Sequence, residues 1–146
     1  MKLPHIILGL ALLGFVMVSC APSEPSTSGP SPIEILETLE TMANEKDLEG
    51  TMALFAKDAV VEESFRNIVF DGTEEIERLW KGYYDYLTVP SEFRDIAVDG
   101  DTATFRWAEV YTQNTNLWPV ILEVQNGKIT YMDFYENKTT VPTGEE

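Results

Sequence analysis

The stretch D-L-E-G-T-M-A-L-F-A-K-D-A-V-V-E-E, residues 47–63, decides the fold that this chain is predicted to adopt. Three of its apolar residues recur at the spacing of one helical face: Leu48, Met52 and Phe55. Asp47 is a residue type that caps helix N-termini, and the charged pair 57–58 is expected to end the helix. The β-branched run that follows predicts a strand over 59–62. Glu63 then stands where the strand ends, a position that can place a carboxylate at the mouth of a cavity.

Two more helices are predicted around this segment. Ser31 and Glu34 form the sequence pattern of a capping box, with Pro32 at the first helical position. A later helix is expected to begin with Thr73 as its cap and to end before Pro90, which cannot continue a helix.

From residue 91 the apolar period changes from helical to two, which is typical of strands. The strands expected from this period are 92–98, 102–113, 117–125 and 129–136. Asp-Gly and Asn-Gly pairs at 99–100 and 126–127 are strong hairpin signals. Three helices followed by such strands predict an α+β fold, with the three N-terminal helices packed on one face of a curved antiparallel sheet.

Three segments carry a resemblance to a known family. The 47–63 stretch, F-D-G-T-E-E-I-E-R-L-W at 70–80 and N-G-K-I-T-Y-M-D-F-Y at 126–135 resemble the helix–strand signature, third helix and last strand of the nuclear transport factor 2-like superfamily. This superfamily includes ketosteroid isomerases, SnoaL-like cyclases, epoxide hydrolase-like enzymes and non-enzymatic binding domains. The resemblance covers residues 32–138 and implies a cone-shaped fold with a pocket. It leaves the function open, because one fold hosts many chemistries.

The N-terminal region has the sequence pattern of a targeting signal. Residues 1–19 have a positive start and an apolar run, as a signal peptide does. M-V-S-C, ending at Cys20, resembles a bacterial lipobox, which implies lipidation of Cys20 and an extracytoplasmic place in the bacterial cell envelope. An ordinary secretory signal or a single membrane span are the alternatives. Residues 20–31 are expected to be a flexible tether and 139–146 a disordered tail.

Composition excludes several function classes. Lys and Arg number 10 against 25 Asp and Glu, which gives a net charge of −15. This charge argues against nucleic acid or anionic lipid as a partner. The only histidine, His5, lies in the predicted signal peptide, and Cys20 is the only cysteine. We therefore predict no Ser-His or Cys-His machinery, no ordinary zinc site and no cofactor.

Glu63 is the first catalytic candidate, because the resemblance places the catalytic acid of ketosteroid isomerase relatives there. The corresponding tyrosine donor is replaced by Leu39, and residues 119–121 lack the expected second carboxyl group. Each lost oxyanion donor costs on the order of 10²–10³ in rate, so steroid isomerisation is not predicted. The alternative is that Glu63 is a solvated residue at a strand end.

Asp133 is the second catalytic candidate, since an acid in the last strand resembles the catalytic aspartate of SnoaL-like cyclases. Its alternative is a surface or interface carboxylate paired with Arg106 or Lys128. An epoxide hydrolase site needs an Asp-Arg-Asp group. Asp58 and Arg66, with Arg106 and Asp133, supply these residue types, but their spacing does not make them converge.

An aromatic-rich set is predicted to line the pocket: Trp80, Tyr84, Trp107, Glu109, Trp118 and Tyr135. Glu109 shares a strand face with Trp107, so it is expected to be a half-buried acid or else a rim charge. The leading prediction is a module that binds a small apolar molecule in a cavity of at least ~300 Å³. The alternatives are a SnoaL-like cyclase, isomerase or hydrolase, and a structural dimer with a filled cone. Strands that are apolar on both faces favour a homodimer.

Overall fold

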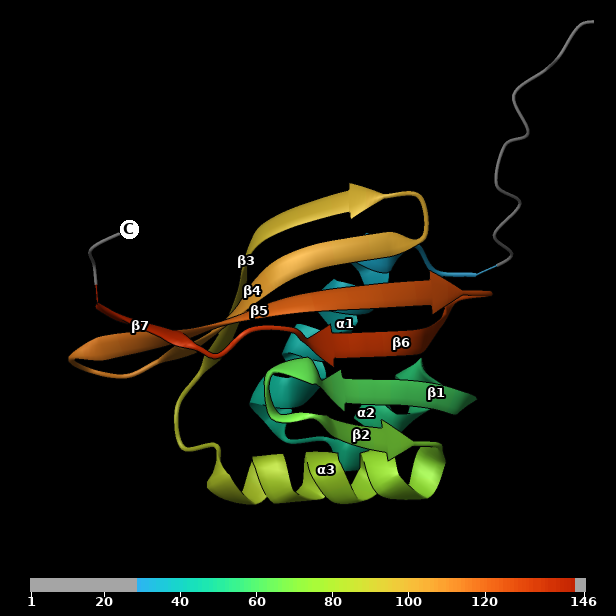
Figure 1. Cartoon of the computed structure of the whole chain (residues 1–146), viewed down its shortest axis with the longest axis horizontal. Coiled ribbons are helices and arrows are strands. Elements are labelled where there is room, and N and C mark those ends of the chain that lie inside the picture. Colours follow the sequence, from blue (N-terminus) through green and yellow to red (C-terminus); the bar gives the residue numbers. More distant parts are fainter. Residues whose placement is uncertain (1–28, 144–146) are drawn as a thin grey trace, which may run out of the picture.

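The computed structural model describes residues 29–143, and Figure 1 shows its helices and strands. The helices are α1 (Pro32–Glu45), α2 (Leu48–Leu54), α3 (Thr73–Tyr86) and the short 3-10 helix η1 (Ser64–Arg66). The strands are β1 (Phe55–Glu63), β2 (Ile68–Asp71), β3 (Ser91–Asp99), β4 (Thr102–Val110), β5 (Asn114–Gln125), β6 (Lys128–Phe134) and β7 (Thr139–Pro142). The predicted signal peptide, Cys20 and most of the predicted tether lie outside the described residues. No helix within 29–143 is long and apolar enough to cross a membrane.

The start of α1 follows the predicted capping box. The Glu34 amide donates to the Ser31 hydroxyl, and the Ser31 amide donates to the Glu34 carboxylate at 2.8 Å. These reciprocal bonds satisfy two backbone N–H groups that would otherwise lack a partner at the start of the helix. The buried face of the helix comprises Ile35, Leu36, Leu39 and Ala43.

The predicted boundary between the second helix and the first strand was wrong. The helix α2 ends at Leu54, three residues before the charged pair at 57–58 that was expected to end it, and β1 begins at Phe55. Phe55 lies opposite Ile129 in the ladder with β6, and its ring packs 6.1 Å from Trp80. Strand pairing and burial of the aromatic ring therefore override the helical periodicity of this short segment.

The start of α3 also differs by one position. Gly72, with a φ of 77°, is the N-cap, whereas Thr73 is the first helical residue. The Thr73 hydroxyl donates to the carbonyl of Lys57 and ties the helix start to β1.

One seven-stranded sheet has the order β2-β1-β6-β5-β4-β3. The seventh strand, β7, pairs with the first residues of β5, whereas β6 pairs with its later residues. The fold class is confirmed, with the difference that β1 runs parallel to β6 while the remaining pairs are antiparallel. Residues 139–142, expected in a disordered tail, instead form β7 opposite residues 114–117. Residues 144–146 are not described.

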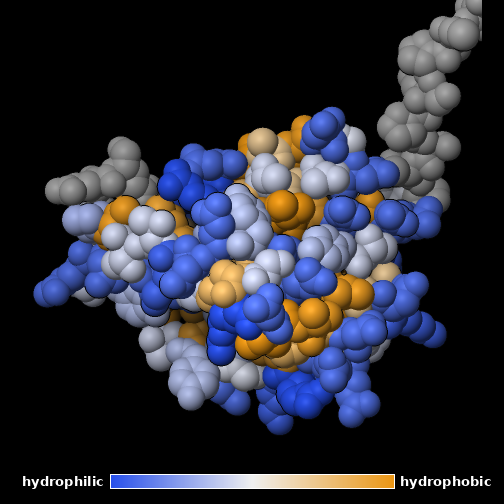
Figure 2. Space-filling view, viewed as in Figure 1, coloured by the Kyte–Doolittle hydropathy of each residue, from blue (hydrophilic) through white to orange (hydrophobic). Residues whose placement is uncertain are grey.

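The helices and the sheet form two layers. In Figure 1, α1 and α2 lie behind the sheet, and α3 runs along its lower edge beside β2. The face toward the helices carries fully buried side chains such as Val61, Phe105, Leu122 and Met132. Figure 2 shows the opposite, outer face, which is largely hydrophilic with apolar patches.

Candidate functional site

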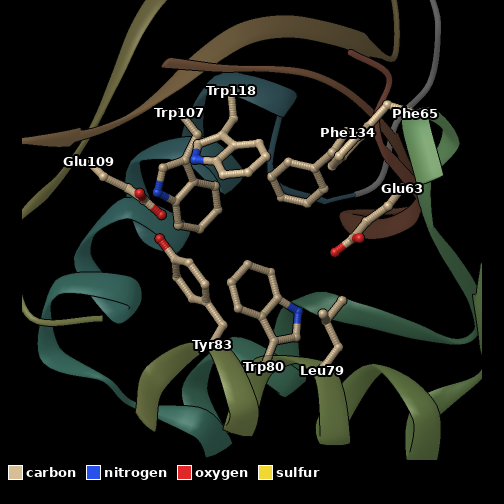
Figure 3. Close-up of a pocket in the computed structure, with 9 residues that line it drawn as sticks. All are labelled: Glu63, Phe65, Leu79, Trp80, Tyr83, Trp107, Glu109, Trp118 and Phe134. Atoms are coloured by element: carbon tan, nitrogen blue, oxygen red, sulfur yellow. The ribbon is translucent and has the colours of Figure 1, made fainter. Parts of the chain in front are cut away.

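A cavity of about 200 Å³ lies between α3 and the sheet, with a wall that is mostly apolar. Nine residues line it (Figure 3): Glu63, Phe65, Leu79, Trp80, Tyr83, Trp107, Glu109, Trp118 and Phe134. The volume is below the ~300 Å³ expected for a drug-sized ligand. The cavity therefore suits a smaller molecule than the sequence predicted.

Helical and strand periodicity place these side chains. Leu79, Trp80 and Tyr83 lie within about one turn of α3, so that they share the side of the helix facing the sheet. Trp107 lies directly opposite Trp118 in the β4–β5 ladder, which puts both indoles on the same face. Strand pairing thus builds one wall and a helix turn builds the other.

Three of the six ring pairs in the cavity wall meet edge to face, and the other three are tilted. Trp80 and Tyr83 cross at 86°, and Tyr83 and Trp107 cross at 84° with ring centroids 5.4 Å apart. Trp118 and Phe134 cross at 90°. Such perpendicular pairs are the favoured arrangement of aromatic quadrupoles, and they hold the cavity wall in a defined shape.

Two adjacent glutamates at the end of β1 point to opposite faces of the sheet, as strand geometry requires. The Glu63 side chain lines the cavity, is 18% exposed and accepts a hydrogen bond from Arg66 at 2.9 Å. Glu62 accepts from the Tyr131 hydroxyl at 3.0 Å on the other face. Glu63 is therefore part of the cavity wall rather than a solvated residue at a strand end.

Glu109 brings a second carboxylate to the cavity, on the side away from Glu63 (Figure 3). The residue is only 9% exposed, and its carboxylate accepts from the Asn116 amide at 3.1 Å and the Tyr111 hydroxyl at 3.4 Å. Figure 3 also shows the Tyr83 hydroxyl pointing toward it. Burial raises the pKa of the Tyr83 phenol, and the charge of Glu109 raises it further, so this hydroxyl stays protonated.

Two indole N–H groups in the cavity wall lack a hydrogen-bond partner within residues 29–143. They belong to Trp80, which is 2% exposed, and to Trp118. By contrast, the Trp107 N–H donates to the Ser91 hydroxyl at 3.0 Å. Buried donors are nearly always satisfied in native proteins, by a water or a ligand if not by the chain. Both indoles line the cavity, but their nitrogens are buried within the wall and are not exposed to the cavity.

The structure places Trp80, Trp107, Glu109 and Trp118 in the cavity wall, together with Glu63. Two other predicted lining residues lie elsewhere. Tyr84 is buried beside the cavity, with its hydroxyl 2.6 Å from that of Thr51. Tyr135 is 38% exposed and does not line the cavity.

Asp133, the second catalytic candidate, lies on the outer side of the sheet and not in the cavity wall. It is 6% exposed and accepts hydrogen bonds from both the amide and the hydroxyl of Ser64. The two basic residues expected to pair with it have other partners. Arg106 forms an ion pair with Asp95, and Lys128 donates to the backbone carbonyl of Ala53. The structure thus does not bring Asp133 together with Glu63 in one pocket.

Four lining residues were absent from the predicted set: Phe65, Leu79, Tyr83 and Phe134. Tyr83 and Leu79 share the buried stripe of the helix that carries Trp80, so helical spacing contained the signal. Phe65 lies in η1, a single 3-10 turn that is too short to show a periodic pattern in the sequence. In the described part of the chain, no group of three or more His, Cys, Asp and Glu residues is placed to hold a metal ion.

Comparisons with known proteins agree with this fold. A family profile described as "SnoaL-like domain" matches residues 36–132. A search of curated protein sequences found no match. Among solved structures, an "NTF-2 like protein of unknown function" from Burkholderia xenovorans is 16% identical with a TM-score of 0.62, covering 78% of this chain and 85% of its own.

Two further similar structures carry enzyme-like names. A "putative ketosteroid isomerase" from Kribbella flavida is 18% identical with a TM-score of 0.61, covering 68% of this chain and 72% of its own. A "putative polyketide cyclase" from Sinorhizobium meliloti is 22% identical with a TM-score of 0.58, covering 68% of this chain and 91% of its own. At these identities the similarity concerns the fold.

Proposed function

Since the chain belongs to the SnoaL-like family, whose domain spans residues 36–132, we propose that its cavity binds one small, largely apolar molecule. The observation that carries this proposal is a cavity of about 200 Å³ with aromatic walls and two carboxylates, those of Glu63 and Glu109. Ligand sites typically combine an apolar lining with a few polar groups that fix orientation. A cone filled by its own side chains would leave no such space.

The direct test is to look for a bound molecule. Native mass spectrometry of the purified full chain is expected to show a co-purifying small molecule, and ligand-observed NMR is expected to show binding of indole or toluene. Leu79→Trp fills the cavity and is expected to abolish binding. Tyr86→Trp adds an indole to the same helix at a residue that is 87% exposed, so it is the matched control. A wild-type chain that carries and binds nothing would favour the structural alternative.

A second candidate function is general acid–base catalysis, which one feature of the cavity favours. Glu63 places a carboxylate in the same apolar cavity as the indoles of Trp80 and Trp118. A carboxylate in an apolar pocket that moves a proton next to a carbonyl is the base used in carbon-acid chemistry.

Hydrogen–deuterium exchange tests this second candidate. The wild-type chain is expected to accelerate exchange at the α-carbon of a small ketone such as cyclopentanone, and Glu63→Gln is expected to abolish the acceleration. Asp133→Asn tests the other candidate acid, which lies outside the cavity wall, and Glu77→Gln at an exposed position on α3 is the matched control. Equal rates with the wild type and Glu63→Gln would exclude Glu63 as the base.

We also propose that the domain forms a homodimer through the outer face of the sheet. Val60 and Ile121 are half-buried on that face, which none of the helices within residues 29–143 covers. Light scattering after gel filtration is expected to give the mass of a dimer, and Ile121→Glu is expected to shift it to a monomer. A wild-type chain that elutes as a monomer would exclude this partner.

A further inference from the structure

We propose that the cavity ligand carries a positive charge and is a small alkylated ammonium ion. Its charged head would lie against the aromatic walls, between the carboxylates of Glu63 and Glu109. This inference rests on the proposed binding function and specifies its ligand class.

The first argument is the charge of the cavity. Glu109 is 9% exposed, and the donors that reach its carboxylate, Asn116 and Tyr111, are both neutral. No Lys or Arg within residues 29–143 forms an ion pair with it. A buried carboxylate is costly unless a cation pairs with it. Glu63 already pairs with Arg66 at 2.9 Å. None of the nine lining residues is basic, so a cationic ligand in the cavity would supply the missing partner of Glu109.

The second argument is the aromatic wall. The faces and edges of Trp80, Tyr83 and Trp107 converge, with ring centroids 5.4 to 5.7 Å apart. Cations are attracted to the faces of such rings within about 6 Å, and alkylated ammonium ions are bound by cages of this kind. One wall residue already shows this attraction, since the Lys138 ammonium lies 5.5 Å from the centroid of the Trp118 ring.

The third argument separates an organic cation from a metal ion. Metal ions such as Ca²⁺ need several oxygen ligands converging on one point. In Figure 3 the carboxylates of Glu63 and Glu109 lie at opposite ends of the cavity, with aromatic carbon between them. An alkylated ammonium ion tolerates this arrangement, because its methyl groups contact the rings while its charge interacts with both ends.

The experiment compares two molecules of the same shape. Choline carries a trimethylammonium group, and 3,3-dimethylbutan-1-ol replaces its nitrogen by carbon, so that only the charge differs. Isothermal titration of the purified full chain is expected to show that choline binds at least about tenfold more tightly. Glu109→Gln keeps the shape of the side chain and is expected to weaken choline binding by a similar factor while leaving the neutral alcohol unaffected.

The control variant is Glu77→Gln, which removes the same charge from an exposed position on α3 and is expected to leave both affinities unchanged. Equal loss of choline binding in both variants would assign the effect to overall charge and overturn the inference. Equal binding of choline and the neutral alcohol would also overturn it, although the proposed binding function would stand. If neither choline nor the neutral alcohol binds, and indole and toluene also do not bind, both the inference and the proposed binding function are wrong. Thermal unfolding of each variant shows whether a loss of binding reflects a loss of fold.

Discussion

The carboxylate of Asp133 accepts two hydrogen bonds from Ser64, the residue that directly follows Glu63. One oxygen of the carboxylate accepts from the Ser64 amide at 3.1 Å, and the other accepts from the Ser64 hydroxyl at 2.8 Å. These two bonds fix the point where β1 turns into η1. Asp133 therefore positions a neighbour of the cavity from the outer side of the sheet.

Asp133→Ala is expected to lower the free energy of unfolding by about 1.5–3 kcal/mol, because hydrogen bonds to a buried charged group are lost. Urea denaturation measures this change. Ser64→Ala removes only the hydroxyl bond and should cost less. The double variant should cost less than the sum of the two single changes, as expected for residues that share a bond. Additive costs would show that the two residues do not interact.

The Thr51 and Tyr84 hydroxyls form a buried hydrogen bond of 2.6 Å between α2 and α3. Tyr84→Phe and Thr51→Val each leave one buried hydroxyl without its partner, so each is expected to cost about 1–3 kcal/mol of stability. The double variant replaces both partners by apolar groups of similar shape and is expected to lie close to the wild type. Thermal and urea unfolding of the four proteins check this cycle. A double variant as unstable as the sum would contradict the pairing.

The stability of the domain is expected to fall above about pH 10. Burial raises the pKa of Tyr83 and Tyr84 in the folded chain, whereas unfolded tyrosines ionise near pH 10. Above that pH the unfolded state binds fewer protons than the folded state, so the free energy of unfolding decreases as pH rises. Below it, this contribution is fully present.

Melting temperatures between about pH 9 and 11 measure this effect. Tyr83→Phe is expected to flatten the pH dependence, since it removes one group with a raised pKa. Tyr86→Phe is the control, because Tyr86 is 87% exposed. An unchanged slope in Tyr83→Phe would show that Tyr83 ionises equally in both states.

We propose that the chain is tethered to a membrane through a lipid on Cys20, and Cys20→Ser tests this directly. The variant is expected to move from the membrane fraction to the soluble fraction when expressed in bacteria. Lipid attachment is checked independently by the mass of the mature chain. A variant that stays with the membrane would argue for an uncleaved span instead of a lipid anchor.

The fold could be predicted from the sequence wherever local signals agree with the tertiary structure. The capping box at Ser31 and Glu34 fixed the start of α1, and the hairpin turns at 99–100 and 126–127 separate the expected strands. The helix boundary at Phe55 was not predictable, because it depends on pairing with Ile129, which is 74 positions away in the chain.

The residues of the candidate site were likewise predictable only in part. Strand alternation was enough to place Trp107 and Glu109 on one face, because side chains two positions apart share a face. It could not show which face of the sheet Asp133 occupies, since a single irregularity in the β5–β6 register, between Glu123 and Val124, changes the alternation.

The sequence by itself determined the helix–sheet architecture and the acidic, histidine-free chemistry of the domain, because these follow from periodicity and composition. Its motifs at 47–63, 70–80 and 126–135 also carried the resemblance to the family. Only the tertiary structure decided which acids face the cavity, how small the cavity is and which indole N–H groups have no partner. Those properties depend on distances between residues on α3, β1, β4 and β5, which no local pattern specifies.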